Sequence, residues 1–151
     1  MYHFKKLNDV GTPPNTSGLS LESTKRRKFE ANGQFGIYMA QFCGALLHLF
    51  GKPNKTSSVA GEAYDYFLEA TDNHEKRWLL TAYHGPSGPA IGENVQDHSI
   101  YPVAKALLEL IESTEPIDFE TKIYDDDTDF TITLGCKDSE CYAQTQPGEH
   151  L

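Results

Sequence analysis

The sequence lacks an apolar run long enough to cross a bilayer. A membrane-spanning helix needs about 20 consecutive apolar residues, and the longest candidate, Phe35 to Phe50, contains Gln41, His48 and two glycines. The N-terminal stretch Met-Tyr-His-Phe-Lys-Lys also lacks the apolar segment of a secretory signal. We therefore expect a cytoplasmic protein that makes no contact with a membrane.

Cysteine is also scarce, with three residues in the whole chain. An odd count fits a reducing compartment better than a disulfide framework. Cys43 lies in an apolar helical run and is expected to be a small core residue. Cys136 and Cys141 are predicted to be a strand cysteine and a turn cysteine, because a zinc site needs four convergent ligands and no histidine lies in their stretch. We expect no metal and no cofactor.

No motif in the chain specifies a reaction. The loop from His84 to Glu93 contains three glycines and two prolines, but it has neither the Gly-Lys-Ser/Thr ending of a P-loop nor the Gly-x-Gly-x-x-Gly spacing. Gly88 directly follows Ser87, so the loop does not match a nucleophile elbow either. We interpret it as a rigid crossover to the next helix, with a ligand or partner loop as the alternative. A binding protein is expected rather than an enzyme.

The apolar content is that of a folded domain. Hydrophobic residues make up 38% of the 151 residues and aromatic residues 11%, whereas a disordered chain of this charge would contain far fewer. A chain of this length fits one domain with a real core. We divide it into an N-terminal arm or loop with a possible edge strand (1–34), a single α+β domain (35–146) and a frayed tail (147–151).

Helical periodicity marks two segments of the sequence. Apolar residues recur every three or four positions from Phe35 to Phe50 and predict one buried helical face, and Gly51 is expected to end this helix. A second apolar stripe predicts a helix from Ile100 to Ser113, with Asp97 or Ser99 as its cap.

Alternating apolar and polar residues predict two antiparallel hairpins. The first covers residues 64–84, and its aromatic side chains are expected to pack against a helix. The second joins strands at 117–124 and 130–136, and Tyr142 to Thr145 can add a short final strand. The predicted fold is therefore a single α+β domain in the order helix, hairpin, helix, hairpin, with a mainly antiparallel sheet packed by two main helices.

Charge is unevenly distributed along a chain whose net charge is −9. Residues 1–55 contain eight Lys and Arg against three Asp and Glu, whereas residues 109–140 contain two Lys against eleven Asp and Glu. The basic cluster Lys25 to Lys28 is too small to make the chain a nucleic-acid binder. An acidic face favours a basic protein partner, and the alternative is that the acidity only maintains solubility.

The strongest acidic cluster is the turn Asp125-Asp126-Asp127-Thr128-Asp129. An EF-hand loop would need a glycine at its sixth position and a glutamate at its twelfth, which this stretch lacks. A solvated turn, a protein-contact patch and a metal site are the three interpretations, in that order. From charge clustering alone, the residues predicted to contact a protein partner are Glu120, Asp125, Asp126, Asp127 and Asp129.

Three central stretches carry a resemblance to a known family: Leu-Leu-His-Leu-Phe-Gly-Lys-Pro at 46–53, Tyr-Asp-Tyr-Phe-Leu at 64–68, and Leu-Leu-Thr-Ala-Tyr-His-Gly-Pro-Ser-Gly-Pro-Ala-Ile-Gly at 79–92. Together they resemble small bacterial immunity proteins, which accompany the polymorphic toxins of contact-dependent growth inhibition. The similarity covers about residues 35–135.

The resemblance implies a non-enzymatic cytoplasmic inhibitor that binds the C-terminal toxin domain of a cognate effector and occludes its active site. Toxins of this kind are often nucleases with a basic substrate groove. Partner contacts differ from one immunity protein to another, so no interface residue is carried over from the family.

Two other functions compete with this one. A small hydrolase would use His84, Ser87 and Glu93, and it requires a base within hydrogen-bond reach of a nucleophile. A regulatory module for a small ligand would be favoured by a closed apolar pocket between helix and sheet. The oligomeric state does not follow from the sequence.

Overall fold

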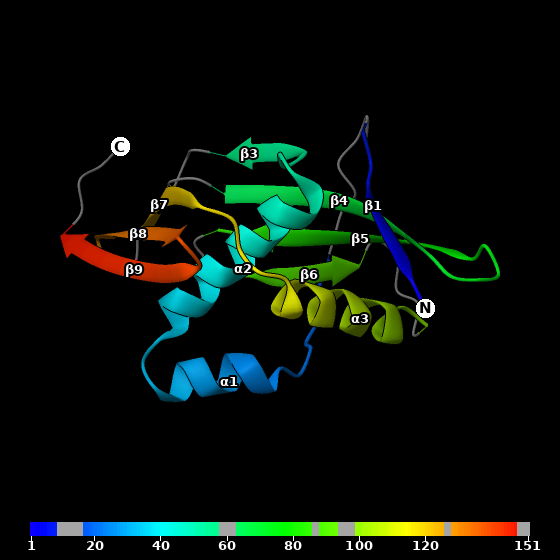
Figure 1. Ribbon diagram of the computed structural model, residues 1–151, viewed down its shortest axis with the longest axis horizontal. Coiled ribbons are helices and arrows are strands. Elements are labelled where there is room, and N and C mark those ends of the chain that lie inside the picture. The colour runs from blue at the N-terminus through cyan, green and yellow to red at the C-terminus, as the bar shows by residue number, and fades with distance from the viewer. Residues whose placement is uncertain (9–16, 58–62, 86–87, 94–98, 126–127, 148–151) are drawn as a thin grey trace.

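The strands form two antiparallel sheets (Figure 1), where the sequence indicated one. The computed structural model describes residues 1–8, 17–57, 63–85, 88–93, 99–125 and 128–147. Along the chain the elements are β1 (His3–Lys6), β2 (Ser17–Gly18), α1 (Thr24–Ala31), α2 (Phe35–Phe50), β3 (Lys55–Ser57), β4 (Ala63–Thr71), β5 (Arg77–His84), β6 (Ala90–Glu93), α3 (Ile100–Ser113), β7 (Phe119–Asp125), β8 (Phe130–Lys137) and β9 (Glu140–Pro147). The predicted α+β class is confirmed.

The larger sheet has the order β1-β4-β5-β6-β2, with β3 paired to β4. Its centre is the predicted first hairpin, in which Tyr66 lies opposite Ala82 and Leu68 opposite Leu80. These side chains are buried in the main core beneath α2 and α3. The hairpin is therefore confirmed, and Trp78 packs in the same core as expected.

Strand β6 lies within the Gly/Pro loop and was missed. It pairs with β5, so that Ile91 lies opposite Ala82 and enters the main core. Part of the predicted crossover is thus a strand of the sheet.

The N-terminal segment also belongs to this architecture. The edge strand considered possible within residues 1–34 is β1, which pairs with β4. Thr24 to Ala31, which lies in the segment predicted to be an arm or loop, is helix α1. Its cap is Ser23, whose hydroxyl accepts a hydrogen bond from the N–H of Arg26 at 3.0 Å.

The smaller sheet has the order β7-β8-β9 and lies at one end of the molecule (Figure 1). Its first two strands are the predicted second hairpin. Asp138 and Ser139, with φ of 52° and 68°, join β8 to β9, and two consecutive positive φ values are those of a type I′ hairpin turn. Because the turn contains only two residues, pairing with β8 begins at Glu140, and β9 is longer than the short strand expected from Tyr142 to Thr145.

Helix α2 lies between the two sheets. On one side Tyr38, Phe42 and Leu46 pack in the main core. On another side Met39 and Ala40 pack against apolar residues of the smaller sheet. The predicted bounds of α2 and its end at Gly51 are confirmed, but the apolar stripe indicated one buried face where the helix has two.

Helix α3 has the predicted bounds. Ser99 occupies its N-cap position but makes no side-chain capping bond to the helix. The Ser99 hydroxyl instead accepts a hydrogen bond from the indole N–H of Trp78 at 3.0 Å, so it ties α3 to β5. Asp97, the other candidate cap, lies outside the described residues. Within the part of the chain that is described, no helix is both long and apolar enough to span a membrane.

We predict that Gly44→Ala destabilises the fold. The connector from α3 to β7 crosses α2 at this glycine, where an added Cβ would lie 2.5 Å from the Cβ of Pro116 and 3.1 Å from the ring of Phe119. Overpacking of this kind costs about 1–3 kcal/mol, although alanine favours a helix by about 1 kcal/mol over glycine.

Urea unfolding of the wild type and the variant measures this change. Gly18→Ala is the matched control, because no atom lies within 4 Å of the added Cβ there. A Gly44→Ala variant that is more stable than wild type would contradict the close approach of the connector.

Candidate functional site

The predicted contact residues that the structure describes lie far apart, along β7 and in the turn that follows it. Glu120 is exposed near the start of β7, and Asp125 is the last residue of that strand, opposite Phe130. A strand rises about 3.3 Å per residue, so the backbones of Glu120 and Asp125 are about 16 Å apart. Asp129 is exposed in the turn and accepts a hydrogen bond from the Tyr124 hydroxyl. Asp126 and Asp127 lie outside the described residues.

Glu120 takes part in a link across the outer face of the smaller sheet. Tyr142 of β9 extends over Gly135 of β8, and its hydroxyl donates a hydrogen bond to a carboxylate oxygen of Glu120 in β7. That hydrogen bond raises the pKa of Tyr142. A side chain at position 135 would collide with the Tyr142 ring, so the glycine makes room for this link.

Negative charge predominates on the smaller sheet. Residues 118–140 contain eight Asp and Glu against two Lys. Ion pairs in the described part of the chain join Arg26 to Glu30 at 2.9 Å and Arg27 to Glu22 at 3.4 Å, and both lie at α1. Arg26 and Arg27 of α1 therefore have acidic partners nearby, while the smaller sheet carries a net negative charge at its end of the molecule.

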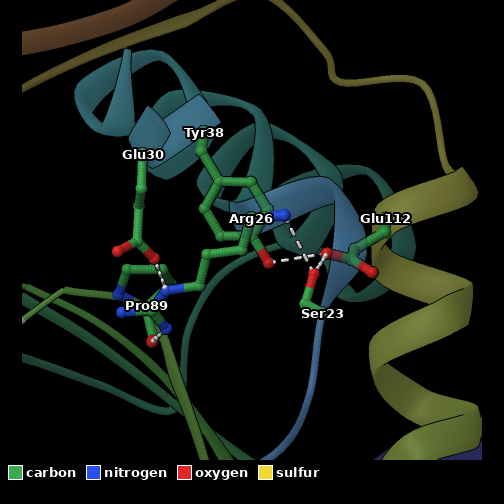
Figure 2. A network of polar contacts seen from close by, with 6 residues as sticks. All are labelled: Ser23, Arg26, Glu30, Tyr38, Pro89 and Glu112. Carbon is green, nitrogen blue, oxygen red and sulfur yellow. Dashed lines mark hydrogen bonds and ion pairs between the residues drawn. The ribbon is translucent and has the colours of Figure 1, made fainter. Parts of the chain in front are cut away.

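A polar network joins α1 to α3 (Figure 2). The hydroxyls of Ser23 and Tyr38 both donate hydrogen bonds to one carboxylate oxygen of Glu112, at 2.8 Å for Tyr38. Lys25 donates to the Glu112 carbonyl at 2.8 Å. Burial and the adjacent Glu112 raise the pKa of Tyr38 well above its usual value. Glu112 is half-buried in this network.

Arg26 completes the network on the side of β6. Its Nε donates to Glu30, and another guanidinium nitrogen donates to the carbonyl of Pro89 at 3.3 Å. The guanidinium also lies over the ring of Phe35, 4.9 Å from the ring centre. These contacts hold α1 against α2 and β6, and they give the network a structural role.

Two surface grooves flank this network. One of about 500 Å³ runs between α1 and β6, and another of about 830 Å³ runs between α1 and α3. Their walls mix apolar residues such as Leu21 and Leu108 with charged residues such as Arg26 and Glu112. Neither is the closed apolar pocket that would favour the small-ligand hypothesis.

The hydrolase residues are not brought together. Glu93 pairs with Leu80, four residues before His84 on β5, which separates the two backbones by about 13 Å. Ser87 lies outside the described residues. His84 is 0% exposed, and neither of its ring nitrogens has a hydrogen-bond partner among the described residues. Its ring lies beside that of Tyr64, and burial lowers the His84 pKa to about 4. A buried base, about 13 Å from Glu93 along the backbone, does not support this hypothesis.

The cysteine prediction was wrong. Cys136 and Cys141 lie directly opposite each other on β8 and β9 and form a disulfide, with their Cα atoms 3.9 Å apart. The type I′ turn sets this register, which the sequence spacing did not reveal. Cys43 is a free, buried cysteine in α2, as expected. The described residues hold no group of three His, Cys, Asp or Glu side chains placed to bind a metal ion.

Comparisons with protein-family models, with curated proteins and with solved structures find no match to this chain. Fold and charge therefore define the protein only as an α+β domain with an acidic second sheet.

Stability is predicted to fall between neutral pH and pH 4 because of His84. The pKa of this histidine is about 6.5 in the unfolded chain and about 4 in the folded protein, which corresponds to about 3 kcal/mol. The unfolded chain binds the proton first as the pH falls. The stabilisation is therefore complete above pH 6.5 and is lost on the way down to pH 4.

Urea unfolding at pH 7, 5.5 and 4 measures this dependence. The variant His84→Leu should lack the loss of stability that His84 causes between pH 6.5 and pH 4. The variant His74→Gln, at an exposed turn position, should retain that loss. If His84→Leu loses stability toward pH 4 as steeply as wild type, titrating carboxylates cause the loss instead.

The disulfide is predicted to stabilise the protein. Closing such a short loop reduces the conformational entropy of the unfolded chain and raises the free energy of unfolding by about 2 kcal/mol. A thiol reductant should therefore lower the unfolding midpoint. Cys141→Ala cannot form the bridge and should be indifferent to the reductant. Alkylation of the unfolded, unreduced protein should label Cys43 alone, and labelling of all three cysteines would contradict the pairing.

Proposed function

We propose that the protein is an immunity protein, an inhibitor that binds the basic toxin domain of a cognate effector through its smaller sheet and covers the toxin's active site. We also propose the cytoplasm as its place of action. The observation that supports the proposal is the separation of charge: residues 118–140, which span β7 to the start of β9, contain eight Asp and Glu against two Lys, whereas the basic residues of α1 lie elsewhere in the fold. In a reducing cytoplasm, Cys136 and Cys141 would be thiols, and the acidic surface would remain.

A protein partner fits this surface better than a nucleic acid. Binding to phosphates requires Lys and Arg that displace counterions, whereas residues 118–140 contain only two Lys. A toxin that binds nucleic acid presents the opposite charge in its substrate groove. An acidic sheet would both steer the inhibitor toward that groove and compete there with the phosphates of the substrate.

The acidic turn also has an apolar neighbour suited to an interface. Phe130 follows Asp129 directly, lies opposite Asp125 and is 40% exposed. Aromatic side chains surrounded by polar residues often contribute most of the binding energy at protein interfaces. In the proposed complex Phe130 would enter an apolar depression of the toxin, while the carboxylates around it meet Lys and Arg.

The proposal predicts that Asp125→Asn, Asp126→Asn and Asp127→Asn together weaken toxin binding. The partner in this test is the C-terminal domain of a large secreted protein encoded by the neighbouring reading frame. Loss of three carboxylates should reduce the association rate about tenfold at low salt and flatten the dependence of affinity on salt.

The control variant changes Glu69, Glu75 and Glu109 to Gln. It alters the net charge by the same amount, but at positions outside the smaller sheet, and it should bind like wild type. Binding kinetics at several salt concentrations measure both variants. Equal affinity and equal salt dependence in the Asp variant and wild type would remove the charge argument.

A further inference from the structure

Strand β9 forms an open edge of the smaller sheet. It pairs with β8 on one side, and on its other side the described part of the chain contains no strand. Figure 1 shows β9 at the outer margin of the molecule. Residues 144–147 are exposed. A strand edge of this kind presents backbone groups that can pair with another chain.

The type I′ turn determines which backbone groups point outward. In a two-residue hairpin, the pair that flanks the turn exchanges hydrogen bonds, and hydrogen-bonded and non-hydrogen-bonded pairs then alternate. Lys137 and Glu140 flank the turn, so Cys136 and Cys141 form the next, non-hydrogen-bonded pair. Their Cα separation of 3.9 Å agrees, because such pairs are the closer ones. The N–H and C=O groups of Cys141, Ala143 and Thr145 therefore point away from β8.

The middle of this edge lacks the features that usually protect edge strands, which β9 has only at its two ends, Glu140 and Pro147. Native edges are blocked by charged side chains, by proline or by bulges. Between Cys141 and Gln146 the sequence has no charged residue and no proline, and every residue of β9 is paired in an unbroken register with β8. The side chains on its outer face are Tyr142, Gln144 and Gln146, which tolerate water and a neighbouring strand equally.

We infer that β9 receives an extended strand of the basic partner, which adds to the smaller sheet beyond β9. The inference deepens the proposed function and rests on it. Charge decides the occupant: residues 118–140 carry eight acidic residues against two Lys, so the sheet of a second copy would be repelled, whereas a strand bearing Lys or Arg would be attracted. Backbone hydrogen bonds determine the register of the added strand against β9, and side-chain charge determines which strand binds.

The test is Thr145→Pro. Proline removes the outward N–H of Thr145 and places its ring at the edge, but it leaves the hydrogen bonds to β8 intact, and edge strands tolerate proline at such positions. Thr145→Ala is the matched control, because it keeps the N–H. Urea unfolding of both variants checks that the fold is retained.

The probe is a blocked ten-residue peptide of alternating Lys and Val, with a Glu and Val peptide as its charge control. We expect the Lys peptide to slow amide exchange at Ala143 and Thr145, and the Glu peptide to leave it unchanged. Thr145→Pro should weaken binding of the Lys peptide about tenfold, and Thr145→Ala should not. Unchanged exchange with the Lys peptide, equal effects of both peptides, or full binding by Thr145→Pro would overturn the inference.

The same variants separate this inference from the proposed function. A toxin domain that binds wild type and Thr145→Pro equally well would remove the role of β9 and leave the inhibitor function standing. A toxin domain that binds neither would remove the function, and the peptide experiment would still decide whether the edge accepts a basic strand.

Discussion

The burial of α2 between two sheets is the constraint on which the rest of the structure depends. Phe42 and Leu46 place the helix on the larger sheet, while Met39 and Ala40 bring the smaller sheet against a second side. A helix that is apolar on nearly all sides must be covered on nearly all sides. Gly44 allows the connector to β7 to pass close to the helix. The smaller sheet is therefore fixed at the end of the molecule by the packing of α2.

The polar network at α1 holds the helices together and pairs basic side chains with acidic ones. Ser23 and Glu112 are 89 positions apart in sequence, yet a hydrogen bond joins them, and Tyr38 donates a second hydrogen bond to Glu112. These two bonds tie α3 both to α2 and to the connector that precedes α1. Carboxylates of α1 and of the connector before it pair with Arg26 and Arg27. Two of the basic residues of α1 are thus paired locally, and negative charge predominates in residues 118–140.

Much of the secondary structure could be predicted because its signals are local. The periodicity of α2 and α3 and the alternation in the two hairpins identified those elements. The division into two sheets could not be predicted, because a one-dimensional apolar stripe does not show that Met39 and Phe42 face different sheets. Strand β6 was missed because it lies in a stretch rich in glycine and proline, and β9 was predicted only as a short strand from Tyr142 to Thr145.

The candidate site was predictable only in part. Clustering in sequence correctly marked an acidic hairpin, but it grouped Glu120 with the turn, although an extended strand separates them. The pairing of Cys136 with Cys141 depends on Asp138 and Ser139 both adopting positive φ, which neither residue type demands as Asn-Gly would. The open edge of β9 is a property of the sheet order and has no signature in the sequence.

The central claim is that the smaller sheet, and not the grooves beside α1, is the working surface of the protein. Hydrogen exchange measured by mass spectrometry, on the chain alone and in complex with the proposed toxin partner, tests this claim most directly. The proposal predicts that exchange slows in residues 119–147 and stays unchanged in α1 and α3. Slowed exchange in α1 and α3, with residues 119–147 unaffected, would contradict it.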